Sequence, residues 1–90
     1  MQCVHLIISG DVQGVGYRSW MKQKAKKLQL VGWVKNRDDG AVEAVVQGDE
    51  KGVQIMIEHA RKGPDVAWVE KVDIAEHSVD TGMIGFEVIY

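Results

Sequence analysis

The stretch GDVQGVGYR, residues 10–18, joins an apolar segment of the chain to an amphipathic one. Its three glycines let successive backbone N–H groups point toward one place, because no Cβ atom clashes. A helix that begins near Tyr17 adds its own unpaired N–H groups and the positive end of its dipole. The stretch therefore predicts a strand-to-helix connection that binds an anion, and phosphate suits such a loop best.

The segments on either side of this loop have the patterns of a strand and a helix. Val4–Ser9 is rich in branched apolar residues, so we expect a strand that stops at Gly10. From Tyr17 to about Leu28 the chain has no glycine or proline. The apolar stripe of this stretch consists of Trp20, Met21, Ala25 and Leu28, and the positions facing away are Lys22, Lys24, Lys26 and Lys27. This pattern is typical of an amphipathic helix whose late lysines complement its dipole.

The rest of the chain predicts another helix and further strands. They are strands at Leu30–Arg37 and Ala41–Gln47, a helix between Asp49 and Gly63, a strand at Ala67–Ala75 and a possible short fifth strand within Gly85–Tyr90. The sequence Asp38-Asp39-Gly40 is a strong hairpin turn. Asp49 is a suitable N-cap, and Gly63 followed by Pro64 is a typical helix end.

The order strand, helix, strand, strand, helix, strand predicts an α+β fold, the ferredoxin-like split βαββαβ sandwich. Two helices then cover one face of a mainly antiparallel sheet. The first and second strands run parallel, and the third lies antiparallel between them. The glycine loop and Asn36 should meet at one end of the sheet, because each lies near the carboxyl end of one of the parallel strands. By analogy with doubly wound sheets, ligands favour this end.

The composition favours one small domain without general affinity for polyanions. The 90 residues, of which 46% are apolar, are expected to form a single domain over residues 1–90. A formal charge of −2 gives no broad attraction for nucleic acid or an anionic membrane. No run is apolar enough to span a membrane and no signal peptide is evident, so we expect a cytoplasmic protein, and a monomer by default.

Neither the cysteine nor the histidines have the pattern of metal ligands. The chain has one cysteine, Cys3, which excludes an intramolecular disulfide and a paired-cysteine metal site. We expect Cys3 to be a buried or terminal thiol. His5, His59 and His77 fall on different predicted elements without metal-ligand spacing, and we assign them no role.

Two polar residues stand where their side chains suggest chemistry. Arg18 lies in the first turn of a predicted helix, where a cation is unfavourable unless an anion balances it. Its guanidinium offers a planar fork of donors to a phosphoryl group; the alternative is a solvated arginine at a helix start. Asn36 stands in a predicted strand, where asparagine is disfavoured. Its carboxamide could align an attacking water, or it could simply pair with the backbone of the hairpin.

Two long sequence patterns resemble those of the acylphosphatases. Residues 10–18 meet the pattern G-x-V-Q-G-V-x-[FY]-R in full. Residues 32–48 meet G-[FYW]-[AVC]-[KRQAM]-N-x(3)-G-x-V-x(5)-G in full, including Trp33, Lys35 and Asn36. The predicted order of elements extends the resemblance to the whole chain.

This resemblance implies hydrolysis of the carboxyl-phosphate bond of an acyl phosphate, without metal or cofactor. It implies that Arg18 binds the phosphoryl group together with loop N–H groups, and that Asn36 orients the nucleophilic water. The loop residues concerned are Gln13, Gly14, Val15, Gly16 and Tyr17. One departure is Arg37, because many relatives have a small hydroxyl residue directly after the asparagine.

Two binding modules are the alternatives to an enzyme. An RNA-recognition domain of this fold needs exposed aromatic residues on its first and third strands, and neither Val4–Ser9 nor Ala41–Gln47 contains one. The tryptophans, Trp20, Trp33 and Trp68, are instead expected to pack in the core or on the sheet. A non-catalytic sensor that binds phosphate or an acyl phosphate remains the second candidate.

Overall fold

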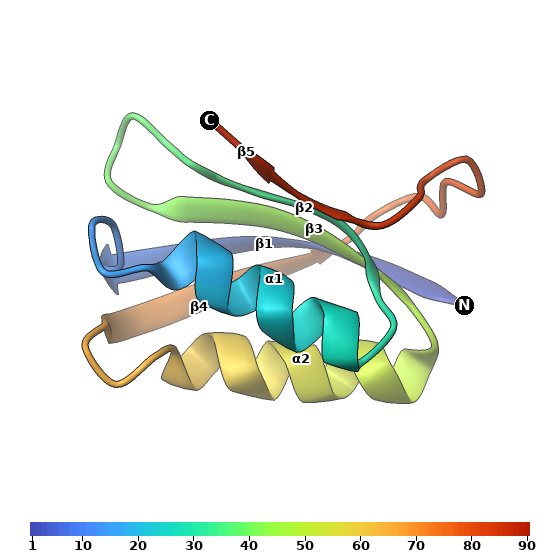
Figure 1. Ribbon diagram of the computed structural model, residues 1–90, viewed down its shortest axis with the longest axis horizontal. Coiled ribbons are helices and arrows are strands. Elements are labelled where there is room, and N and C mark those ends of the chain that lie inside the picture. Colours follow the sequence, from blue (N-terminus) through green and yellow to red (C-terminus); the bar gives the residue numbers. More distant parts are fainter.

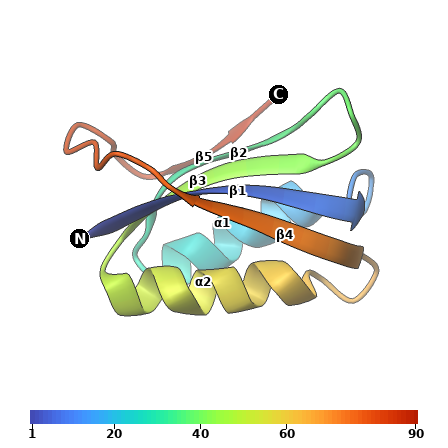
Figure 2. The ribbon, with the colours of Figure 1, turned by 180° about the vertical axis from the view of Figure 1, so that it is seen from behind.

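Five strands form one sheet, and two helices pack on one of its faces (Figure 1). The computed structural model describes residues 1–90. The elements are β1 (Gln2–Asp11), α1 (Tyr17–Lys27), β2 (Val31–Asn36), β3 (Val42–Gly48), α2 (Glu50–Lys62), β4 (Trp68–Glu76) and β5 (Phe86–Ile89). Both helices lie on the same side in the view from behind (Figure 2), so the other face of the sheet carries no helix. Neither helix is long and apolar enough to cross a membrane.

The sheet has the strand order β4-β1-β3-β2-β5. Since β3 pairs antiparallel with both β1 and β2, these two strands run parallel with β3 between them. The short strand β5 pairs parallel with β2 at the edge. The predicted ferredoxin-like α+β fold is therefore confirmed, including its fifth strand. The loop after β1 and the β2–β3 hairpin both project from one end of the sheet, on the left of Figure 1.

The first strand is longer than its sequence pattern indicates. We expected it to stop at Gly10, but β1 continues to Asp11. Its register with β4 shifts between Ser9 and Gly10. Gly10 has a φ of 134°, and a Cβ atom there would lie 2.2 Å from the carbonyl oxygen of Trp68. The glycine thus forms an irregularity within a paired strand rather than ending it.

Alternate residues of β1 build the core between the sheet and the helices. Val4, Leu6 and Ile8 are at most 2% exposed, and burying such a side chain stabilises the fold by about 1.5–3 kcal/mol. From α1, Met21 and Ala25 are buried as predicted. The core cluster comprises 17 buried residues drawn from both helices and the sheet.

The three tryptophans do not behave alike. Trp20 packs against the core, and Trp33 is half-buried on the face without helices. Trp68, which we expected to pack, is 70% exposed. That expectation is wrong because Trp68 begins the edge strand β4, which has a neighbouring strand on only one side.

Tyr17 joins the two helices through its hydroxyl group. The side chain is 1% exposed, and its hydroxyl donates a hydrogen bond of 2.7 Å to the carbonyl oxygen of Ala60 in α2. Four residues after Ala60 the chain has Pro64, which has no N–H to donate. Tyr17 therefore supplies the donor that the proline lacks, and this bond fixes the start of α1.

Replacing Tyr17 with phenylalanine is expected to lower the free energy of unfolding by about 1–3 kcal/mol, because it leaves a buried carbonyl without a donor. Urea unfolding followed by tryptophan fluorescence would measure the change. The control is Tyr90→Phe, since Tyr90 is 96% exposed and its hydroxyl forms no hydrogen bond within the protein. Equal stabilities of the two variants would contradict the role of the Tyr17 hydroxyl.

Candidate active site

The glycine loop presents a free helix start at the end of the sheet. Gly14 and Gly16 have φ angles of 75° and 78°, which favour glycine. A Cβ atom on either would meet nothing within 4 Å, so space in front of the loop is open. Gly16 is the N-cap of α1, where no side chain caps the helix and no acidic residue occupies the first turn. The first N–H groups of α1 and its positive dipole end therefore remain available to an anion.

A pocket of about 90 Å³ lies in front of this loop and brings residues from three parts of the chain together. Its lining consists of Val12, Gly14, Gly16, Tyr17, Arg18, Ser19, Asn36, Val88 and Tyr90. Arg18 and Asn36 thus share one pocket, which agrees with the expectation that they meet at one end of the sheet. Of the other predicted loop residues, Gln13 and Val15 do not line it.

The end of the chain holds the guanidinium of Arg18. Its Nη1 atom donates a hydrogen bond of 3.3 Å to the carbonyl oxygen of Ile89, and its Cζ atom lies 4.7 Å from the ring centroid of Tyr90. None of the five ion pairs includes Arg18. The cation at this helix start is therefore placed by β5 and has no acidic partner, so its charge is available to a ligand.

The carboxamide of Asn36 is also without a partner. Asn36 ends β2 opposite Val42 and is half-buried, yet no side-chain hydrogen bond involves it. The hairpin is closed without it, because Arg37 N–H bonds to the Ala41 carbonyl and the Asp39 carboxylate accepts from Ala41 N–H. The alternative that Asn36 pairs with the hairpin backbone is thus wrong. Both its donor and its acceptor are therefore without a partner in the protein.

Comparison with known proteins agrees with this arrangement. The family model described as Acylphosphatase matches residues 4–88. The chain belongs to the acylphosphatase family. It is 49% identical over 76 residues to an acylphosphatase of Thiobacillus denitrificans, which covers 84% of this chain and 85% of the relative.

Solved acylphosphatase structures have the same fold along the whole chain. The crystal structure of acylphosphatase from Bacillus subtilis gives a TM-score of 0.95 at 37% identity, with 100% of both chains covered. The structure of an acylphosphatase from Coxiella burnetii gives a TM-score of 0.93 at 40% identity, covering 98% of this chain and 92% of that one. The resemblance drawn from the two sequence patterns is confirmed.

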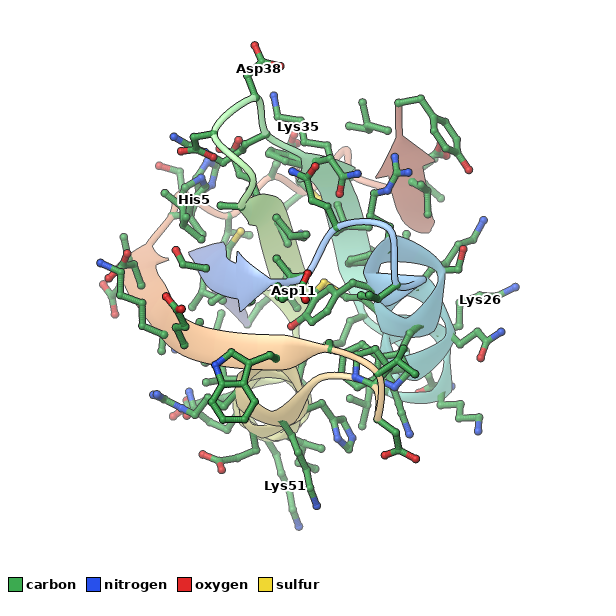
Figure 3. The ribbon with its side chains drawn as sticks, turned by 90° about the vertical axis from the view of Figure 1, so that its left-hand side faces the viewer. His5, Asp11, Lys26, Lys35, Asp38 and Lys51 are labelled. Carbon is green, nitrogen blue, oxygen red and sulfur yellow. The ribbon has the colours of Figure 1, made fainter.

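Arg37, the one departure from the family pattern, does not line the pocket that contains Arg18. Its Nε and Nη2 atoms lie 3.1–3.2 Å from the carboxylate oxygens of Asp39, and its Nη1 lies 3.8 Å from Glu43. The guanidinium holds the pKa of Asp39 below its usual range, mainly through this hydrogen bond. Arg37 lines a hollow of about 340 Å³ at the hairpin, whose lining residues are all polar. Asn36 borders both this hollow and the pocket of Arg18. In Figure 3, which looks onto this end of the sheet, Asp38 marks the hairpin tip and points away from the glycine loop.

His5, to which the sequence assigned no role, binds Glu43 on the face without helices. Its Nε2 atom lies 2.6 Å from Glu43 Oε2, and Lys35 Nζ lies 3.8 Å from the other carboxylate oxygen. Figure 3 shows His5 and Lys35 on the side of the sheet away from Lys51 of α2. The hydrogen bond from His5 lowers the pKa of Glu43 below its ordinary value of 4.5.

This lowered pKa predicts a loss of stability in acid. A carboxyl group whose pKa is lower in the folded state stabilises the fold above its unfolded pKa of 4.5, and this contribution disappears as the pH falls through the folded value. Glu43→Gln removes the titration, so its free energy of unfolding should fall less steeply than that of the wild type below pH 4.5. Urea unfolding at a series of pH values measures both slopes. Glu58→Gln, at an exposed position of α2, is the control, and parallel curves for wild type and Glu43→Gln would contradict the prediction.

Cys3 is buried, as predicted, and lies away from the candidate site. Its side chain is 3% exposed, with Sγ 3.7 Å from Nδ1 of His77. Burial raises the pKa of the Cys3 thiol, so the protonated form prevails at neutral pH. The thiol also lies at the start of β1, at the opposite end of that strand from the glycine loop.

Proposed function

We propose that this chain hydrolyses acyl phosphates to a carboxylate and inorganic phosphate, with Arg18 and Asn36 as its catalytic residues. The observation that supports this most directly is the shared pocket, in which an arginine without an acidic partner and an asparagine without a partner lie beside a free helix start. A guanidinium and several N–H groups suit a phosphoryl group. An uncommitted carboxamide suits a water molecule.

The size of the pocket supports a small phosphoryl group as its occupant. About 90 Å³ is well below the ~300–1,000 Å³ of sites that enclose drug-sized ligands. The phosphoryl group is therefore bound inside and the acyl part lies outside. Such a site recognises the part that all acyl phosphates share.

We assign to the loop N–H groups and Arg18 the stabilisation of charge on the phosphoryl oxygens. The loop residues proposed for this role, through their backbone N–H groups, are Gln13, Gly14, Val15, Gly16 and Tyr17, of which Gly14, Gly16 and Tyr17 line the pocket. Phosphoryl transfer proceeds through a loose transition state that needs positioning and charge stabilisation more than a strong base. Donors that are fixed before the reaction supply that stabilisation.

Asn36 is proposed to align the attacking water opposite the leaving oxygen. A neutral carboxamide is a poor base, so the water proton passes to the substrate phosphate itself. The carboxylate is a good leaving group and requires no strong general acid. This scheme uses groups of the chain and substrate alone, without a metal ion or cofactor.

Phosphate release from benzoyl phosphate in the presence of EDTA tests the proposed function. We expect turnover by the wild type that EDTA does not reduce, with inorganic phosphate as a competitive inhibitor. A folded wild type that binds phosphate without turnover would instead support the sensor. Loss of turnover in EDTA, restored by a divalent cation, would overturn the metal-independent scheme.

The organisation of the protein is part of the same proposal. One continuous core underlies the whole sheet, which supports a single domain over residues 1–90. The cytoplasmic location and the monomeric state stay predictions of the sequence. Light scattering of the purified protein measures the latter.

A further inference from the structure

The side chain of Gln13 bridges the glycine loop and the β2–β3 hairpin. Its Nε2 atom donates hydrogen bonds of 2.8 Å to the carbonyl oxygen of Arg37 and 2.9 Å to that of Ala41. The two bonds use both N–H groups of the carboxamide. Because Gln13 does not line the pocket, its side chain acts on the hairpin and not on a ligand.

These two bonds are the only hydrogen bonds between residues 12–16 and residues 37–41. Within the hairpin, Arg37 N–H bonds to Ala41 at 2.8 Å, and Gly40 N–H bonds to Arg37 at 3.3 Å. Gln13 therefore adds a second donor to each of two carbonyl groups that already close the turn. It attaches the hairpin to the loop at the point where β2 ends.

The attachment point is one peptide away from Asn36. Arg37 follows Asn36 directly, and the Asn36 side chain forms no hydrogen bond that would hold it independently. The position of this carboxamide relative to Arg18 therefore depends on the backbone at residues 36–37. A misplacement of about 1 Å is enough to cost on the order of 10²-fold in rate.

We propose that Gln13 is a positioning residue that sets the distance between the phosphate-binding loop and the water-orienting Asn36. This inference rests on the proposed function of Asn36. Glutamine fits the task because it has both the reach and two donors. Methionine of similar length has no donor, so Gln13→Met removes the bonds and keeps most of the side-chain volume.

The first test compares turnover with phosphate binding. In Gln13→Met we expect kcat for benzoyl phosphate to fall about tenfold, while the inhibition constant of inorganic phosphate changes less than twofold. The control is Gln23→Met, at an exposed position of α1 without hydrogen bonds, for which both values should stay unchanged. If phosphate inhibition weakens as much as kcat falls, Gln13 shapes the loop and the inference is wrong.

The second test combines Gln13→Met with Asn36→Ala. If Gln13 acts through Asn36, adding Gln13→Met to Asn36→Ala should lower kcat less than twofold further. If kcat of the double variant instead falls by the product of the two single losses, the inference is overturned and the role of Asn36 stays intact. Normal turnover of Asn36→Ala alone would instead overturn the proposed function of that residue.

A third variant keeps the inference testable if Gln13→Met does not fold. Gln13→Glu has the same length and regains one O–H donor only when its carboxyl group is protonated. We expect its kcat, divided by that of the wild type, to rise as the pH falls through the carboxyl range. A ratio independent of pH would contradict the proposed hydrogen bonds to the hairpin.

Discussion

Arg18→Ala is expected to lower kcat/KM for benzoyl phosphate by at least about 10²–10³, the loss typical of removing one fixed donor from a transition state. The guanidinium has no acidic partner within the protein, so its charge is free for the phosphoryl group. Steady-state kinetics measure the loss. Because Arg18 is not an ion-pair partner, the free energy of unfolding should change little.

Arg18→Lys separates the charge of this residue from its geometry. Lysine keeps the cation but loses the planar fork of donors, so we expect a strong loss as well. The control is Arg61→Ala, since Arg61 is an exposed arginine in the last turn of α2. Near-normal turnover in Arg18→Ala, or equal losses in Arg18→Ala and Arg61→Ala, would remove Arg18 from the mechanism.

Asn36→Ala is expected to reduce kcat by about 10²-fold, with little change in inhibition by inorganic phosphate. The reason is that the carboxamide touches the water in this scheme and not the phosphoryl group. In Asn36→Ala, kcat should therefore fall while inhibition by inorganic phosphate stays nearly unchanged. In Arg18→Ala, kcat should fall and inhibition by inorganic phosphate should weaken as well.

Asp38→Ala is the matched control for Asn36, because Asp38 lies in the same hairpin, is exposed and points away from the loop (Figure 3). It should turn over benzoyl phosphate at the wild-type rate. A loss of phosphate inhibition in Asn36→Ala equal to its loss of kcat would show that Asn36 binds the phosphoryl group instead.

The order of elements could be predicted because each is encoded over a short stretch. Apolar spacing, the Asp38-Asp39-Gly40 turn and the Gly63-Pro64 helix end are all local signals. The prediction that the first strand stops at Gly10 is wrong, because the local sequence does not distinguish a glycine that ends a strand from one that forms an irregularity within it. Only the close approach of the Trp68 carbonyl in β4 distinguishes them.

The site could be predicted only in part, for a related reason. Topology places the carboxyl ends of two parallel strands together, so Arg18 and Asn36 followed from the predicted order. The contacts of Arg18 with Ile89 and Tyr90 could not be predicted, since a short strand such as β5 can pair at either edge of a sheet. The contact of the Gln13 carboxamide with the hairpin is also long-range, and no local pattern indicates which carbonyl groups a glutamine meets.

The placement of Arg18 by β5 makes activity less robust than the fold. This four-residue edge strand pairs with β2 alone, and Phe86 is its one fully buried side chain. Detachment of such an edge is a local opening that requires less free energy than global unfolding. It would carry Ile89 and Tyr90 away from the guanidinium while the other four strands stay assembled. Enzymatic inactivation should therefore begin at urea concentrations below those at which the tryptophan fluorescence reports cooperative melting.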